Sequence, residues 1–192
     1  MKVLITGFEP FGGSEVNSSW ETAVRVGQLA PKGVCVETLL LPVSFMRAGK
    51  KIREALRERR PDVLIMLGQR SKGESIDIER IAINMMDASS PDNDGYHPQE
   101  QTIVDGGEAA HFSNLPVKTL RDALLHRGIT ARVSNSAGLY VCNSTYYNAL
   151  NEIYDQGLPT KALFIHLPII SEDFPIEMLT DAILAIIDTI IH

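Results

Sequence analysis

Short apolar runs alternate along this chain with stretches of helical periodicity, and this rhythm constrains the fold more than any other feature of the sequence. The clearest run, Val63–Gly68, is almost continuously apolar. Strands of that kind are typical of a parallel sheet whose two faces are both covered. Strands that alternate with helices indicate βαβ units. The sequence therefore predicts an α/β fold, a single-domain three-layer α/β/α sandwich around a mostly parallel, twisted sheet.

The boundaries of these elements follow from capping residues, prolines and glycines at the ends of each pattern. We expect strands at residues 3–8, 34–43, 63–68, 130–134 and 162–166, and helices at 18–29, 45–59, 116–126, 142–154 and 175–191. Alternation along the second strand places Cys35 beside β-branched residues and predicts that it lies in the core.

Two segments depart from this rhythm. Residues 76–86 alternate between charged and apolar side chains, which predicts a more exposed, antiparallel strand. Residues 88–114 are rich in Pro, Asp, Gly and Gln. A structureless loop of that length is unusual in a compact domain unless it covers a site.

Composition and charge exclude several classes of protein. The 192 residues suit one domain, 1–192, and the net charge of −6 argues against nucleic acid as a partner. The start of the chain is apolar too briefly for a signal peptide, and the apolar stretch 182–191 contains Asp188 and is too short to span a membrane. We therefore expect a cytoplasmic protein, not bound to a membrane, whose cysteines are reduced.

No cofactor or metal is predicted. The chain has no close Cys/His pairs of the zinc type and no acidic cluster with the spacing of a calcium loop. The turn Gly7–Gly13 lacks the Lys and Ser/Thr of a phosphate-binding loop. Phe8 and Phe11 in this turn are either core residues or walls for a flat apolar ligand, and the adjacent glycines favour the second interpretation.

Cys142 is the best candidate nucleophile. Sites in open α/β sheets gather at the carboxyl ends of strands, and Cys142 lies after such an end, where the next helix begins. The unpaired amides and positive dipole of a helix start favour a thiolate and are able to bind an oxyanion. Position alone leaves open the alternative that Cys142 is a small residue packed at a helix start. Cys35 has neither advantage.

His166 is the best partner for this cysteine. It ends an apolar strand, so its ring can project into the crevice at the strand ends and exchange a proton with the thiol. A buried core histidine is the alternative. A third group would orient the imidazole, and the candidates are Asp77, Glu79 and Asp87. Glu79 has only a modest lead, because its face of the strand also carries isoleucines and a buried carboxylate needs a partner. A surface ion pair is the alternative.

Five blocks of sequence resemble one known family, in the same order. They are Gly7–Gly13 (GFEPFGG, followed by Asn17), Ile78–Asn84 (IERIAIN), Pro91–Gly95 (PDNDG), Ser134–Asn143 (SNSAGLYVCN) and Phe164–Pro168 (FIHLP). On these blocks the chain is similar to pyroglutamyl peptidase I, also called pyrrolidone-carboxylate peptidase, a family of cysteine peptidases.

This resemblance implies a Cys142, His166 and Glu79 triad. It also implies that Phe8 and Phe11 hold the pyrrolidone ring and that backbone groups near Gln69 recognise the lactam N–H and C=O. The implied substrates are peptides with an N-terminal pyroglutamate. The family often forms homotetramers, so a homo-oligomer is expected.

The sequence departs from the family pattern at two places. Many members have an arginine where this chain has Ser89, and loss of that cation is expected to affect turnover if it stabilises the oxyanion or positions the loop. The sequence 169–173 also differs from the usual pattern, which affects a local loop or a subunit contact. Two other functions remain open: a non-catalytic binder of pyroglutamyl peptides and a nucleoside-phosphorylase-like enzyme.

Overall fold

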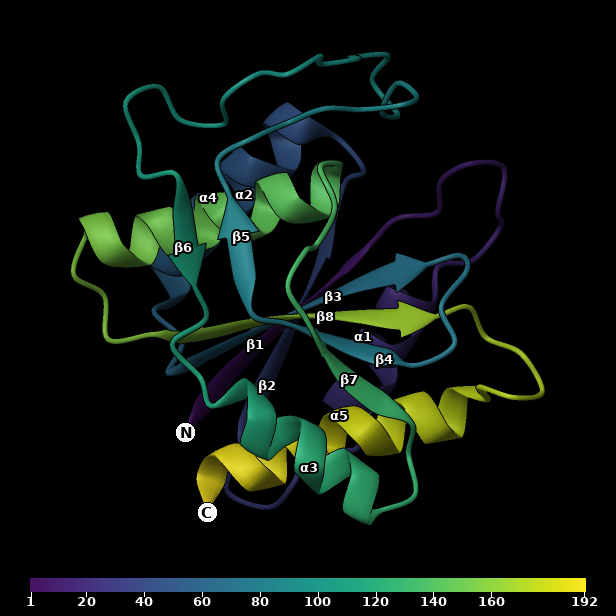
Figure 1. The fold of residues 1–192 in the computed structure, drawn as a ribbon. Helices are drawn as coiled ribbons and strands as arrows, with labels where there is room; N and C mark the ends of the chain where they lie inside the picture. The colour runs from purple at the N-terminus through teal and green to yellow at the C-terminus, as the bar shows by residue number, and fades with distance from the viewer.

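Helices and strands alternate along most of the chain, as the computed structural model of residues 1–192 shows (Figure 1). The strands of the large sheet are β1 (Lys2–Phe8), β2 (Cys35–Leu41), β3 (Val63–Arg70), β4 (Ile76–Glu79), β7 (Ala131–Ser134) and β8 (Lys161–Pro168). The short strands β5 (Ile81–Ile83) and β6 (Ala110–Phe112) form a separate pair. The helices are α1 (Ser18–Gln28), α2 (Phe45–Arg59), α3 (Val117–His126), α4 (Val141–Asp155) and α5 (Ile176–Ile191).

The large sheet is mostly parallel, as the sequence predicts. Its six strands lie in the order β2-β1-β3-β8-β4-β7. Every neighbouring pair is parallel except β8 and β4, which run antiparallel. The sheet is therefore made of two parallel groups that meet at the β8–β4 junction.

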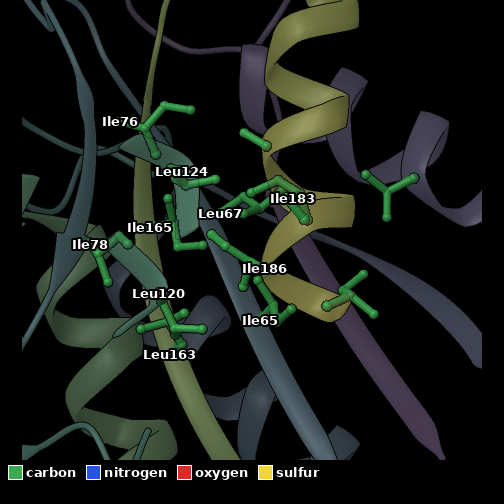
Figure 2. Close-up of a cluster of buried hydrophobic side chains, with 14 of the residues drawn as sticks. Ile65, Leu67, Ile76, Ile78, Leu120, Leu124, Leu163, Ile165, Ile183 and Ile186 are labelled. Carbon is green, nitrogen blue, oxygen red and sulfur yellow. The ribbon is translucent and has the colours of Figure 1, made fainter. Parts of the chain in front are cut away.

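Helices cover both faces of this sheet and make three layers (Figure 1). Alternate residues of β3 point to opposite faces, so that Ile65 and Leu67 lie in one hydrophobic core and Leu64 and Met66 in the other. The two cores contain 24 and 23 buried residues, so neither face is left open. Figure 2 shows the first core, in which β3, β4 and β8 pack against α3 and α5. The predicted α/β/α arrangement is confirmed.

The segment 76–86 differs from the expected exposed strand. It bends at Arg80. The backbone N–H of Arg80 donates a hydrogen bond to the carbonyl oxygen of Ser134, and its carbonyl oxygen accepts one from the backbone N–H of Ser113. The part before the bend, β4, is fully buried between β8 and β7, and the part after it, β5, leaves the sheet. The expectation of exposure was wrong for β4, because its alternating polar residues are paired inside the protein, whereas Ile81 and Ile83 are half-buried. The expected antiparallel direction is confirmed, since β4 runs antiparallel to β8 and β5 runs antiparallel to β6.

Cys35 is exposed, and the prediction that it lies in the core was wrong. It is the first residue of β2, which is an edge strand of the large sheet. β-branched neighbours indicate a strand, but only the position of that strand in the sheet decides whether its first residue is covered.

The long segment between β5 and β6 crosses over the layer of α2 and α4 (Figure 1). Asn84 organises it, because its side-chain oxygen accepts hydrogen bonds from the backbone N–H groups of Ile103 and Val104, both at 2.9 Å. The buried Asp92 attaches it to the start of α2, where it accepts from Phe45 N at 2.9 Å. None of the five helices combines the length and apolar character that crossing a membrane requires.

Candidate active site

The side chains of Glu79 and His166 meet across the antiparallel junction of β4 and β8. His166 Nδ1 lies 2.7 Å from Glu79 Oε1, and the two residues are 5% and 0% exposed. The register pairs Asp77 with His166 and Glu79 with Phe164, so Glu79 reaches the imidazole diagonally. Of the three carboxylates considered from sequence, Glu79 is therefore the one in contact with this histidine.

Cys142 is the second residue of α4 and lies in its first turn. Tyr140 caps this helix with extended backbone and no side-chain hydrogen bond, which leaves amides of the first turn available to a ligand. Gly68 of β3 leaves room for the thiol, since a Cβ atom at Gly68 would lie 3.1 Å from Sγ of Cys142. The cysteine thus lies at a helix N-terminus over the middle of the sheet, as the sequence predicts.

The proton affinity of His166 reflects its two neighbours. Burial on its own lowers the pKa of this imidazole, but hydrogen bonding and charge from Cys142 and Glu79 outweigh burial and raise the pKa to about 9. The surroundings therefore favour an imidazolium. An imidazolium between a thiol and a carboxylate stabilises the thiolate, which is the nucleophilic form.

A cavity of about 140 Å³ opens directly on Cys142 and His166. Phe8, Phe11 and Gln69 line it as well, and Glu79 lies behind it, in contact with His166. The structure therefore brings together the three residues of the implied triad and the three implied ring-binding residues. Its remaining lining residues are Asn17, Val43, Ala137, Tyr140 and Val141. Apart from the imidazole, the lining includes no basic side chain and no carboxylate. The cavity suits a small, flat and neutral group.

The residues that line the cavity are held by contacts with a helix, a strand and the long segment between β5 and β6. Gln69 uses its side-chain oxygen to accept from Ser18 N at 2.8 Å, at the start of α1. Phe8 packs near Phe164, with ring centroids 6.5 Å apart. Tyr140 donates from its hydroxyl to Pro91 O at 2.9 Å, which attaches the long segment 84–109 to the site. That segment therefore borders the site.

The other carboxylate candidates lie elsewhere. Asp77 pairs with Arg70 and Arg132 rather than with His166. Asp87 lines a neighbouring hollow of about 390 Å³ together with Ser89, and this hollow shares Phe11 and Tyr140 with the cavity. A larger hollow of about 540 Å³ lies between the segments 71–74 and 169–178 and includes none of the triad candidates.

Sequence reasoning missed Arg70, whose Nη2 lies 3.5 Å from Oε1 of Glu79. It also missed Val43 and Tyr140 as cavity residues. Arg70 is a charged residue at the carboxyl end of an apolar strand, and this position is the one signal in the sequence from which it could have been found.

Comparison with known proteins identifies the family. The sequence profile of the family described as pyroglutamyl peptidase matches residues 1–185. This chain belongs to the pyroglutamyl peptidase family. The resemblance drawn from five sequence blocks is confirmed, and the chain is a member of a cysteine peptidase family of hydrolases.

Individual members of the pyroglutamyl peptidase family are similar over nearly the whole chain. The pyrrolidone-carboxylate peptidase of Thermococcus onnurineus is 45% identical over 175 residues, which cover 90% of this chain and 86% of the relative. The structure of a mutant (A199P) pyrrolidone carboxyl peptidase from P. furiosus superposes with a TM-score of 0.95 at 37% identity and covers 100% of this chain and 98% of the other. The crystal structure of Bacillus amyloliquefaciens pyroglutamyl peptidase I superposes with a TM-score of 0.93 at 35% identity. This superposition covers 100% of this chain and 97% of the other.

Proposed function

We propose that this protein removes N-terminal pyroglutamate from peptides, with Cys142 as nucleophile, His166 as general base and acid, and Glu79 as the group that orients the imidazole. The observation that carries the proposal is the buried 2.7 Å contact between Glu79 and His166 beside a helix-start cysteine and a neutral cavity. Membership of the pyroglutamyl peptidase family supports the choice of substrate.

The proposed reaction has two steps, both of which use His166. The Cys142 thiolate attacks the pyroglutamyl carbonyl carbon, and the oxyanion that forms is stabilised by amides in the first turn of α4. The imidazolium gives its proton to the departing amine as the C–N bond breaks, which leaves a thioester. Water then attacks the thioester while His166 takes a proton, and C–S cleavage releases pyroglutamate and restores the thiolate.

The charge and size of the cavity support selection of the lactam. A pyroglutamyl ring offers one N–H donor, one C=O acceptor and two flat apolar faces, which suit the backbone at Gln69 and the rings of Phe8 and Phe11. A peptide with a free amino terminus would bring an ammonium group into a cavity of about 140 Å³ with no carboxylate in its lining. Loss of hydration without compensation disfavours that binding.

We also propose that residues 1–192 act as one catalytic domain in the cytoplasm and assemble into a homo-oligomer, a homotetramer by the family resemblance. A catalytic thiolate works only while reduced, which suits the cytoplasm. Exposed apolar side chains support assembly, among them Phe112, Ile169 and Ile170. Light scattering on the eluting protein tests this: a mass of four times 21.2 kDa is expected, and a mass of 21.2 kDa would contradict it.

Release of the chromophore from a pyroglutamyl amide under reducing conditions tests the activity. We expect saturable product formation that prior alkylation of the thiol abolishes. A second candidate function, a non-catalytic binder of pyroglutamyl peptides, is motivated by Ser89, at a position where the family resemblance leads us to expect an arginine. Saturable binding of a pyroglutamyl peptide by the reduced, folded protein without any product would favour the binder.

A further inference from the structure

The buried carboxylate of Glu79 has two cationic neighbours. Oε1 lies 2.7 Å from Nδ1 of His166 and 3.5 Å from Nη2 of Arg70. Oε2 is buried and has no hydrogen-bond partner. Burial of a carboxylate is costly unless charge or hydrogen bonds compensate for the lost hydration. The contact with Arg70 is therefore more significant than an ion pair between two solvated groups, although the arginine side chain itself is 30% exposed.

Asp77 holds the guanidinium of Arg70 in this place. Its Oδ2 lies 2.5 Å from Nη1 of Arg70, and its side chain is 1% exposed. Arg132 donates two more hydrogen bonds to Asp77, at 2.7 and 2.8 Å, and the Ser75 hydroxyl donates a third at 2.7 Å. Burial raises the pKa of Asp77, but these hydrogen bonds and the two arginine charges outweigh burial and hold the pKa below its ordinary value. Asp77 is thus a fixed anionic anchor.

The same arginine also reaches the loop that leads to the nucleophile. Nη2 of Arg70 lies 3.5 Å from the carbonyl oxygen of Ser136, and the next residue, Ala137, lines the catalytic cavity. One guanidinium therefore contacts the Glu79 carboxylate, the Asp77 carboxylate and the segment before Cys142.

We propose that Arg70 is a positioning residue of the triad: held by Asp77, its guanidinium fixes the Glu79 carboxylate against His166 and balances one negative charge of the Cys142–His166–Glu79 group. This inference rests on the proposed function for its catalytic consequence. The part of the inference that concerns the effect of the Arg70 charge on the proton affinity of His166 does not depend on the substrate.

The charged and titratable groups around Glu79 and His166 determine the sign of the expected effect. Five elements contribute them: β3 with Arg70, β4 with Asp77, β7 with Arg132, α4 with Cys142 and Tyr146, and β8 with His166 itself. Burial raises the pKa of Tyr146, so it stays neutral. Removal of the positive charge of Arg70 makes the group more negative, so every proton that it binds is bound more tightly. Both limbs of the pH profile of kcat/KM then move to higher pH.

The test compares Arg70→Met with Arg70→Lys in the full-length protein. With a pyroglutamyl amide as substrate, we expect both limbs of the Arg70→Met profile to shift upward by about 0.5 to 1 pH unit, because a partly exposed charge is partly screened. We expect a several-fold lower kcat as well. Arg70→Lys keeps the charge, so its limbs stay at the wild-type pH while kcat falls, since lysine lacks the fork that holds two carboxylates.

Arg132→Met is the matched control. Like Arg70, Arg132 donates hydrogen bonds to the Asp77 carboxylate, but its side chain is 62% exposed and forms no hydrogen bond or ion pair with Glu79. Arg132 still adds positive charge near Glu79, so we expect its two limbs to move in the same direction but by clearly less than those of Arg70→Met. Equal shifts in Arg132→Met and Arg70→Met would show a general effect of net charge and overturn the inference. Unshifted limbs in a folded Arg70→Met protein would overturn it too, and would make the ion pair purely structural.

An NMR titration of the His166 imidazole separates this inference from the proposed function, because it needs no substrate. The pKa of His166 is expected to be higher in Arg70→Met than in the wild type. If the wild type cleaves no pyroglutamyl amide but the imidazole titration shifts, the proposed activity fails and the Arg70 coupling stands. If activity is present and neither the titration nor the limbs move, the activity stands and the coupling fails.

Discussion

His166 Nδ1 and Glu79 Oε1 lie 2.7 Å apart in a part of the protein that is almost completely closed to solvent. Because Nδ1 is engaged by the carboxylate, Nε2 is left free for the proton transfers with the thiol and the departing amine that we propose. The pair thus fixes the ring's direction and supports its positive charge.

Glu79→Gln is predicted to lower kcat by about 100-fold or more, because a neutral amide does not stabilise the imidazolium. The pKa of His166 is raised by Glu79, so its loss moves the upper pH limb of kcat/KM to lower pH. Steady-state kinetics across pH measure both effects. A variant whose kcat stays within about threefold of the wild type would contradict the orienting role.

Cys142→Ala is predicted to abolish hydrolysis of a pyroglutamyl amide, whereas Cys35→Ser retains nearly all of it. Cys35 lies exposed at the start of the edge strand β2, far in the fold from the helix start that carries Cys142. Initial rates of the two purified variants provide the measurement, with circular dichroism to show that each is folded. Equal losses in the two folded proteins would remove Cys142 from its proposed role.

Protein stability is predicted to depend on pH through His166. Burial opposes the charged ring, but Cys142 and Glu79 raise the pKa from 6.5 to about 9. A folded-state pKa above the unfolded value gives a stabilisation that is complete below pH 6.5 and is lost as the pH rises through about 9. The Tm of the wild type is expected to fall over that window more steeply than the Tm of His166→Gln. Parallel curves for the two proteins would argue against this assignment.

Gly68→Ala is predicted to impair both stability and turnover. A Cβ atom there would lie 2.8 Å from a ring carbon of Phe164 and 3.1 Å from Sγ of Cys142. Overpacking of this kind costs about 1–3 kcal/mol, and the thiol would be displaced. Gly27→Ala is the control, because its Cβ would meet only a methyl group of Thr38, at 3.0 Å. Urea unfolding and kcat measure the two effects, and wild-type kcat in Gly68→Ala would show that the thiol tolerates the methyl group.

Ser89→Arg is predicted to raise kcat with little change in KM. The hollow of about 390 Å³ that Ser89 lines adjoins the catalytic cavity and has room for a longer side chain. A guanidinium in that hollow would stabilise developing negative charge on the substrate oxygen. Ser89→Met controls for size alone. An unchanged or lower kcat in Ser89→Arg would show that the present loop works without this cation.

Local patterns predicted most of the fold, because apolar strands and amphipathic helices each produce a recognisable hydrophobic pattern within a short stretch of sequence. The helix at Phe45–Arg59 was predicted to the residue, and the other helices within one or two. The bend at Arg80 and the burial of β4 were missed, since they depend on partners far along the chain, Ser113 and Ser134. The alternation over residues 76–86 did predict the antiparallel direction that β4 has against β8, but not which strand it would pair with.

The positions of Cys142 at a helix start and of His166 at a strand end made them candidates for the site, because helix starts and strand ends have known chemistry. Position did not distinguish Glu79 from Asp77, since both lie on one face of β4, and the family resemblance made that choice. Their separate roles become visible only in three dimensions, where Arg70 and Arg132 neutralise Asp77 and the imidazole lies against Glu79. Arg70 was missed because a charged residue after an apolar strand ordinarily faces solvent.

The place of β8 in the sheet has a consequence for how a newly made chain matures. This strand is near the end of the sequence, yet it lies between β3 and β4 and joins the two halves of the sheet. A nascent chain that stops before Lys161 contains the strands of β2-β1-β3 and of β4-β7, but it lacks the strand that pairs with both groups. Pairing over such sequence distances forms late. The same strand carries His166, so a chain that stops before β8 lacks the proposed partner of the thiol, and we expect that such a chain does not cleave pyroglutamyl peptides.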